Sequence, residues 1–397
     1  MPALRIPITN IFGGGDYTAA IQVGSHRAAA NVILDTGSST LAVTQKAYQP
    51  DQDTSRKATS LAQDIAYVTG GWAGPVLNTV ISVSGAGGSA GLNNGAVAVA
   101  LDQLPNNFGA ADGILGLAYQ SLNTCYNLKP FLTEKGVNPP VTFPWPFPAA
   151  NTASAIEQIQ KLFRTFPQTP LPPFFTQLID AKKTINKFAF YTRRSIPKPD
   201  PNDPENHGYF ILGGGEEQAD LFQGNFAKVD VVHDAWYNTT LKSVKVDGSA
   251  AVPTPALPAA YRKQMISNSV IDSGTNSLAL SNAMFTAIME SLDPGLRAIA
   301  LQALQSRTGI ANSQVQPQRW PNITFTLLGD KGQLVPLTCS PQTYWQLDAG
   351  APGRASFQIN NMGQVQCILG LPLFNNYYTV FDRSVDKSGV VSFAPIK

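Results

Sequence analysis

Asn31-Val-Ile-Leu-Asp-Thr-Gly-Ser-Ser-Thr-Leu41 carries one carboxylate, that of Asp35, from an apolar run into a turn of glycine and small hydroxyl residues. The run 32–34 predicts a buried strand, and Gly37 gives the turn the backbone freedom that it needs. By itself an Asp-Thr-Gly tripeptide is typical of many solvent-facing turns. Whether this loop is a functional site or an ordinary turn therefore depends on the rest of the chain.

A second stretch, Ser269-Val-Ile-Asp-Ser-Gly-Thr-Asn-Ser-Leu278, repeats the apolar lead-in, the Asp-hydroxyl-Gly-hydroxyl core and the trailing leucine. Its carboxylate belongs to Asp272. Each stretch is followed by the same Ile-Leu-Gly-Leu segment, at 114–117 and at 368–371. Two signals in the same order in each half predict a duplicated fold with internal twofold symmetry, in which the two aspartates can meet.

These motifs resemble those of the pepsin-like aspartic proteases, and the resemblance runs along nearly the whole chain. After the two aspartate loops, Asp112-Gly-Ile-Leu-Gly-Leu-Ala118 is the most specific match. The resemblance implies a mostly β, bilobal pepsin-like acid protease fold. Its two lobes would be β-barrels of the six-stranded type, related by a pseudo-twofold axis, with a few short helices. We expect an N-terminal lobe at 1–190 and a C-terminal lobe at 191–397.

The same resemblance implies an aspartic endopeptidase in which Asp35 and Asp272 share one proton. Two carboxylates about 3 Å apart cannot both ionise cheaply, so one acts as the acid while the other acts as base on a water. We expect activity at acid pH on protein or peptide substrates, inhibition by pepstatin-type compounds, a monomeric state, and no metal or cofactor.

Further residues gain expected roles from the resemblance. Thr36 and Ser273 would hydrogen-bond across to the opposite loop, and Ser38 and Thr275 would hold the carboxylates in plane. Contacts to the substrate are expected from a set of glycines, flap residues and one apolar residue: Gly37, Gly274, Tyr67, Thr69 and Ile114.

The segment 64–74 has the composition of a hairpin with a glycine-rich tip and resembles the flap that covers the substrate, with Tyr67 as its tyrosine. Alternatively, Tyr67 is a strand residue with its ring in the core. Three positions depart from the family: Ala42 replaces a tryptophan that supports the flap tyrosine, Val68 replaces a glycine, and Ala111 replaces a phenylalanine, which would widen the S1 pocket.

Prolines interrupt the segment 123–173, which we interpret as an insertion on the first lobe. It either borders the cleft and biases specificity or forms a passive surface loop. Within it, 152–163 predicts an amphipathic helix. Other helices are expected at 174–178, from Ser281 onward and at 293–304.

The chain of 397 residues carries 28 Lys and Arg against 26 Asp and Glu, a formal net charge of +2. This balance gives no support for nucleic acid as a partner. An apolar run of about 18 residues is absent, so no membrane span is expected. Segment 1–10 is too short and proline-rich for a signal peptide, and too little chain precedes Asp35 for a propeptide. The protein would be cytoplasmic if Met1 is the native start and secreted if the chain is a mature form.

Three cysteines cannot all pair within one chain. The family resemblance implies a disulfide between Cys339 and Cys367 in the second lobe and leaves Cys125 as a buried free thiol. Asn238 and Asn322 begin glycosylation sequons that matter only for a secreted protein.

Other classes of protein fit the sequence less well. The histidines, His26, His207 and His233, are scattered without metal-ligand spacing or a serine nucleophile motif. The segment 85–90 matches a dinucleotide-binding glycine pattern, but the next residues, 91–95, cannot open a helix, so we expect a hairpin loop. A glycosidase would not need duplicated Asp-hydroxyl-Gly loops. The remaining alternative is a catalytically inactive relative of the same fold that serves as a binding or inhibitor protein.

Overall fold

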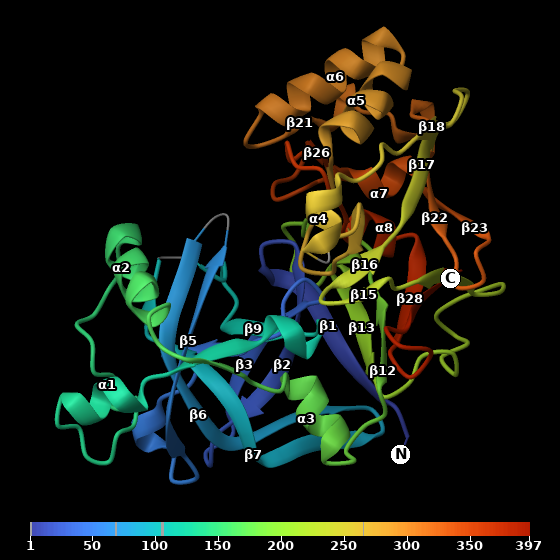
Figure 1. Ribbon diagram of the computed structural model, residues 1–397. Helices are drawn as coiled ribbons and strands as arrows, with labels where there is room; N and C mark the ends of the chain where they lie inside the picture. Colours follow the sequence, from blue (N-terminus) through green and yellow to red (C-terminus); the bar gives the residue numbers. More distant parts are fainter. Residues whose placement is uncertain (1, 68–69, 105–106, 265) are drawn as a thin grey trace. The chain divides into compact units, whose positions relative to one another are not determined.

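A computed structural model describes residues 2–67, 70–104, 107–264 and 266–397 (Figure 1). The chain forms two compact units, one of residues Thr18–Ile185 and one of Pro2–Tyr17 together with Asn186–Lys397. Strands dominate both units and the helices are short, so the predicted mostly β class is confirmed.

The first unit contains most of the long strands. Its elements are β2 (Asp16–Val23), which begins at the unit boundary, β3 (Ala28–Asp35), β4 (Leu41–Thr44), β5 (Lys57–Tyr67), β6 (Gly70–Gly85), β7 (Gly88–Ala100), β8 (Asp102–Gln103), β9 (Gly113–Gly116), β10 (Thr124–Asn127), α1 (Lys129–Glu134), α2 (Ala153–Phe163), β11 (Gln168–Pro170) and α3 (Phe174–Asp180).

Six strands of this unit close into a barrel in the order β6-β7-β4-β9-β3-β2, because β2 pairs back onto β6. Apolar side chains from successive strands fill it, among them the fully buried Val32, Leu34 and Val43. The predicted six-stranded barrel is confirmed for this unit. Burying these runs on folding is the main source of its stability, at about 25 cal/mol per Å² of apolar surface.

The glycine-rich segment 85–90 forms the turn between β6 and β7, where Gly85 pairs with Gly88. Gly87 and Gly88 have φ values of 102° and 126°, a region that residues with a Cβ rarely adopt. The hairpin interpretation is therefore confirmed, and the glycines serve the turn.

The second unit distributes its strands over several sheets. Its elements are β1 (Leu4–Gly13), β12 (Lys187–Tyr191), β13 (His207–Leu212), β14 (Ala227–Asp230), β15 (His233–Asp234), β16 (Tyr237–Thr239), β17 (Leu241–Val246), β18 (Val252–Pro253), α4 (Ala259–Lys263), β19 (Ser269–Ile271), β20 (Leu278–Leu280), α5 (Asn282–Ser291), α6 (Pro294–Gln305), β21 (Ile310–Ala311), β22 (Ile323–Leu328), β23 (Leu334–Cys339), α7 (Pro341–Tyr344), β24 (Trp345–Leu347), β25 (Arg354–Phe357), β26 (Ile359–Asn361), β27 (Cys367–Leu369), α8 (Leu371–Phe374), β28 (Tyr377–Asp382) and β29 (Val390–Pro395).

The start of the chain packs with its second half. Strand β1 runs antiparallel to β13, with Leu4 opposite Leu212 and Thr9 opposite His207. The ladder continues through β12 and β28, and its inner face carries an aromatic cluster in which Phe188 stacks on Phe381 with ring centroids 4.9 Å apart. Residues 2–17 therefore lie in the second unit, whereas the sequence places all of 1–190 in the first lobe.

The predicted helices form with ends displaced by one or two residues. Thr152 caps α2 by accepting a hydrogen bond from the Ala155 N–H, and Asp293 caps α6 by accepting from the Gly295 N–H. Helix α3 begins at Phe174, and α5 follows Ser281. No helix in the described part of the chain is both long and apolar enough to cross a membrane.

The predicted disulfide is wrong: Cys339 and Cys367 are both buried free thiols. Cys339 ends β23, which pairs with β22, while Cys367 begins β27, which pairs with β19 in a different sheet. The two thiols are therefore held in different sheets, and they form no disulfide. Cys125 is the buried free thiol that the sequence predicts.

Candidate active site

The Asp35 carboxylate lies at the end of β3, directly after the buried strand residues. The backbone N–H of Gly37 donates to Oδ1 at 2.7 Å, and the Ser38 hydroxyl donates to Oδ2 at 2.5 Å. Asp35 is only 8% exposed. Both carboxylate oxygens therefore have a donor from the loop itself, and these bonds fix the plane of the carboxylate.

Strand β9 supports this loop. It runs parallel to β3, with Leu34 opposite Leu115 and Asp35 opposite Gly116. A Cβ on Gly116 would collide with the backbone of Ser39, so only glycine allows the turn to cross so closely. The Ile-Leu-Gly segment thus supports the strand that carries Asp35, as the sequence predicts, by pairing beside it in the same sheet.

The Asp272 loop repeats this construction within the second unit. The Gly274 N–H donates to Oδ1 at 2.9 Å, and the Thr275 hydroxyl donates to Oδ2 at 2.7 Å. Asp272 is 8% exposed, like its counterpart. Strand β27 runs parallel to β19, with Ile271 opposite Leu369. A Cβ on Gly370 would collide with the carbonyl oxygen of Thr275.

The strand that leaves each loop is also equivalent. In the first unit Leu41 of β4 lies opposite Leu115 of β9, and in the second Leu278 of β20 lies opposite Leu369 of β27. The repeat seen in the sequence thus extends to hydrogen bonds, burial and strand register. Each unit independently builds the same cradle for one carboxylate.

Thr36 and Ser273, the residues that follow the two aspartates, are buried, with exposed fractions of 0% and 1%. The hydrogen bond that each would make to the opposite loop stays a prediction.

The predicted substrate-binding residues have different environments. Tyr67 ends β5, but its side chain lies outside the described residues, as do Val68 and Thr69. Ile114 is buried in β9 opposite Ala42 of β4. Their contacts with a substrate stay predictions. The Gly37 and Gly274 N–H groups donate to Oδ1 of Asp35 and Asp272, and their contacts with a substrate also stay predictions.

Sequence reasoning missed a buried polar network behind the first loop. Thr40 donates to the side-chain oxygen of Asn123 at 2.9 Å, and Gln63 of β5 donates to the same oxygen at 2.7 Å. The signal available in the sequence was Asn123 itself, a polar residue at the point where the chain departs from the family pattern.

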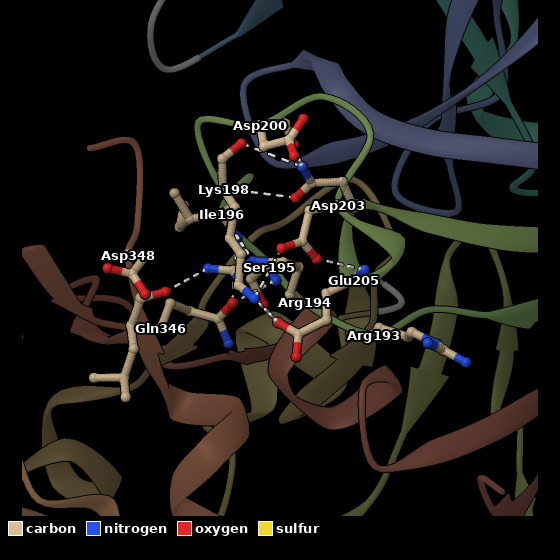
Figure 2. A network of polar contacts seen from close by, with 12 residues as sticks. Arg193, Arg194, Ser195, Ile196, Lys198, Asp200, Asp203, Glu205, Gln346 and Asp348 are labelled. Atoms are coloured by element: carbon tan, nitrogen blue, oxygen red, sulfur yellow. Dashed lines mark hydrogen bonds and ion pairs between the residues drawn. The ribbon is translucent and has the colours of Figure 1, made fainter. Parts of the chain in front are cut away.

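The second unit also contains a polar network that sequence reasoning missed, centred on the buried guanidinium of Arg194 (Figure 2). This group donates to Glu205 at 3.0 Å and to the carbonyl oxygens of Ile196 and Leu347. Gln346 accepts a hydrogen bond from the Ser195 N–H at 2.9 Å. The network ties the chain after β12 to β24 (Figure 2).

The backbone of Gly15 lies close both to Ser195 and to Asn276 of the Asp272 loop. A Cβ on Gly15 would collide with the Ser195 carbonyl oxygen and approach the side chain of Asn276. A cavity of about 600 Å³ beside the network is lined by Arg193, Trp345 and their neighbours, and neither Asp35 nor Asp272 lines it. In the part of the chain that the structure describes, no cluster of His, Cys, Asp or Glu is arranged to hold a metal ion.

Two strand-turn loops that cradle one aspartate each, on parallel Ile-Leu-Gly strands, define the aspartic protease class. The chain belongs to the eukaryotic aspartyl protease family, whose model matches residues 16–137 and 166–395. The unmatched residues 138–165 lie inside the segment that the sequence marks as an insertion.

Curated relatives agree with this assignment at low identity. The chain is 23% identical to pepsin-2B of Gadus morhua over 96% of both chains. It is 21% identical to a beta-secretase of Strongylocentrotus purpuratus over 95% of this chain and 66% of the relative. It is 26% identical to cathepsin D of Chionodraco hamatus over 55% of this chain and 49% of the relative. Family membership supports a peptidase function.

Proposed function

We propose that the chain is an aspartic endopeptidase that hydrolyses peptide bonds in proteins, with Asp35 and Asp272 activating a water between them. The observation that carries this proposal is the identical cradle of the two carboxylates. In each, a glycine N–H donates to Oδ1 and a hydroxyl donates to Oδ2. A family member without activity has no need to keep both sets of donors.

In the proposed reaction one aspartate is ionised and takes a proton from the water, whose oxygen attacks the peptide carbonyl carbon. The other aspartate is protonated and donates its proton to the carbonyl oxygen. Collapse of the tetrahedral intermediate then breaks the C–N bond, and a carboxyl proton moves to the leaving amine. Because the dyad must hold one proton in total, the rate should be highest in acid.

The remaining roles follow the same proposal. Thr36 and Ser273 would tie the loops together, while Gly37, Gly274, Tyr67, Thr69 and Ile114 would contact an extended peptide. The two units would serve as the lobes, and the enzyme would act as a monomer inhibited by pepstatin-type compounds.

The test is cleavage of an unfolded protein across about pH 3 to 7 by the wild type, Asp35→Asn and Asp272→Asn, with and without pepstatin. We expect acid-dependent cleavage that either substitution reduces by about a thousandfold or more. Each variant should retain the circular dichroism spectrum of the wild type. Cleavage that survives both substitutions would contradict the proposal.

The second candidate is an inactive binding or inhibitor protein of the same fold. Ala42 favours it, because this fully buried alanine stands where the family has the tryptophan that supports the flap tyrosine. A folded wild type that cleaves nothing at any pH, yet binds a protein partner, would establish this alternative.

A further inference from the structure

The hydroxyl run after Asp35 ends at Thr40, whose side chain points away from the carboxylate into a buried amide network. The Oδ1 atom of Asn123 accepts from the Thr40 hydroxyl at 2.9 Å and from Gln63 Nε2 at 2.7 Å. All three side chains are at most 2% exposed. A buried amide that loses its partner pays the full cost of desolvation, so these bonds resist rearrangement.

Asn123 also fixes both ends of the insertion. Its Nδ2 donates to the Leu171 carbonyl at 2.8 Å, and the Leu171 N–H donates back to the Asn123 carbonyl at 2.8 Å. Gln63 adds a bond from Nε2 to the Thr124 carbonyl at 3.0 Å. One side chain thus connects the catalytic loop, strand β5 and the two ends of the segment 123–173.

The insertion then follows β5 along its backbone. Strand β10 pairs with it, placing Tyr126 opposite Ala62, and the Thr142 hydroxyl donates to the carbonyls of Thr59 and Leu61 at 3.0 and 2.8 Å. Near the far end, Gln160 of α2 donates to the Ile65 carbonyl at 3.4 Å. Figure 1 shows α2 beside β5.

Apolar packing supports the same contact. Phe163 of α2 is fully buried and its ring lies 5.6 Å from that of Tyr126, in a cluster that includes Ala62 of β5 and Ala73 of β6. The insertion is therefore a packed layer on the β5–β6 hairpin, held by hydrogen bonds and by apolar contacts.

We propose that Asn123 and Gln63 are positioning residues that lock strand β5 to the Asp35 loop, and that the insertion uses them to set how the hairpin meets a peptide substrate. This inference rests on the proposed peptidase function for its effect on substrate. Neither residue touches the reacting atoms. They act by holding β5, which ends at the expected flap tyrosine, in one orientation relative to Asp35.

Gln63→Leu tests this coupling of β5 to the Asp35 loop, because it keeps the side-chain volume but removes the donor. Thr142→Val is the matched control: it removes a hydroxyl that links the insertion to two β5 carbonyls, at 3.0 and 2.8 Å, but leaves Thr40 and Asn123 paired. Gln63→Glu provides a conservative variant. Only the donor of Gln63 is used, because its Oε1 has no hydrogen-bond partner among the described residues, and a protonated glutamate can still donate.

The first readout is peptide hydrolysis. Gln63→Leu should raise KM for an extended peptide roughly tenfold with a smaller change in kcat, and Gln63→Glu should recover most of this loss in acid. Thr142→Val should change KM less than about threefold. Equal KM effects in Gln63→Leu and Thr142→Val would overturn the proposal, since a general loss of stability would then explain both.

The second readout does not depend on catalysis. Amide hydrogen exchange in the full chain should accelerate by about tenfold or more in both 36–44 and 57–66 for Gln63→Leu, but only in 57–66 for Thr142→Val. If the amide exchange rate of residues 36–44 is the same in Gln63→Leu as in the wild type, the proposed coupling between β5 and the Asp35 loop is refuted. If the wild type cleaves no peptide, the proposed function fails, while this exchange result still decides whether the two segments are coupled.

Discussion

Ser38 and Thr275 donate to the outer oxygen of their aspartates, and removing either hydroxyl should change the pH dependence of cleavage. In the proposed mechanism, a hydroxyl that donates to a carboxylate stabilises its ionised form, so loss of the hydroxyl should move the acid limb of the pH–rate profile to higher pH. For Ser38→Ala and Thr275→Ala we expect kcat/KM to fall by roughly ten- to a hundredfold at the optimum.

Ser39→Ala is the control for this prediction, because the Ser39 hydroxyl donates to the Tyr119 carbonyl and not to an aspartate. Its profile should keep the wild-type acid limb. An unshifted limb in Ser38→Ala, measured with the same peptide, would show that the hydroxyl does not tune the dyad.

Asp64 of β5 should make the stability of the fold depend on pH. Burial raises the pKa of this carboxyl from 3.8 to about 6, although the positive charge of Arg164 and the Tyr126 hydroxyl act in the opposite direction. The folded chain therefore keeps the proton between about pH 4 and 6, where the unfolded chain has lost it. This contribution to stability is complete below about pH 4 and is lost as the pH rises through about 6.

Asp64→Asn should remove this dependence and raise the free energy of unfolding at neutral pH by up to about 3 kcal/mol. Urea unfolding at about pH 4 and pH 7 measures the effect. Asp51→Asn, at an exposed site, serves as the control and should keep the wild-type difference between the two pH values. An Asp64→Asn variant with that same difference would contradict the prediction.

At the scale of elements, Arg194 joins the segment after β12 to strand β24. The three nitrogens of its planar guanidinium donate separately to Glu205, Ile196 and Leu347. A lysine ammonium presents all its donors from one nitrogen and cannot span these three acceptors. Arg194→Lys should lower the free energy of unfolding by about 2–4 kcal/mol, because buried carbonyls lose their donors. Arg193→Lys, at the neighbouring exposed position, should change it by less than about 0.5 kcal/mol.

Urea unfolding followed by tryptophan fluorescence measures both variants, since Trp345 begins the strand that Arg194 contacts. Equal losses of unfolding free energy in Arg194→Lys and Arg193→Lys would mean that the guanidinium hydrogen bonds of Arg194 add nothing to stability.

For the chain as a whole, the free thiols predict a stability that does not depend on redox conditions. Cys125, Cys339 and Cys367 are buried, and burial raises the pKa of the Cys125 thiol to about 11 and that of the Cys367 thiol. A thiol that stays protonated and covered reacts slowly. The melting temperature should therefore be the same with and without dithiothreitol.

Thiol labelling of the native protein should give no rapid reaction, and all three cysteines should react once the protein unfolds. A drop in melting temperature on reduction, or only one reactive thiol in the unfolded oxidised protein, would restore the disulfide that the family resemblance implied.

The sequence by itself determined the two aspartate loops, the Ile-Leu-Gly segments that support them and the helices α2 and α6. The loops and the helix α2 follow from local patterns: an apolar run into an Asp-hydroxyl-Gly turn, or an amphipathic helical repeat. Such patterns act over a few residues, so a single chain displays them directly. The N-cap that the sequence predicts at Ser281 makes no side-chain bond to α5.

Only the tertiary structure decided where the insertion packs, where residues 2–17 belong and whether Cys339 meets Cys367. These outcomes depend on which strands pair across a hundred residues or more, as β1 does with β13. The same holds for Asn123, whose partners Thr40 and Gln63 come from separate parts of the chain. Pairing at such distances is set by how buried surfaces fit together, and no local pattern encodes it.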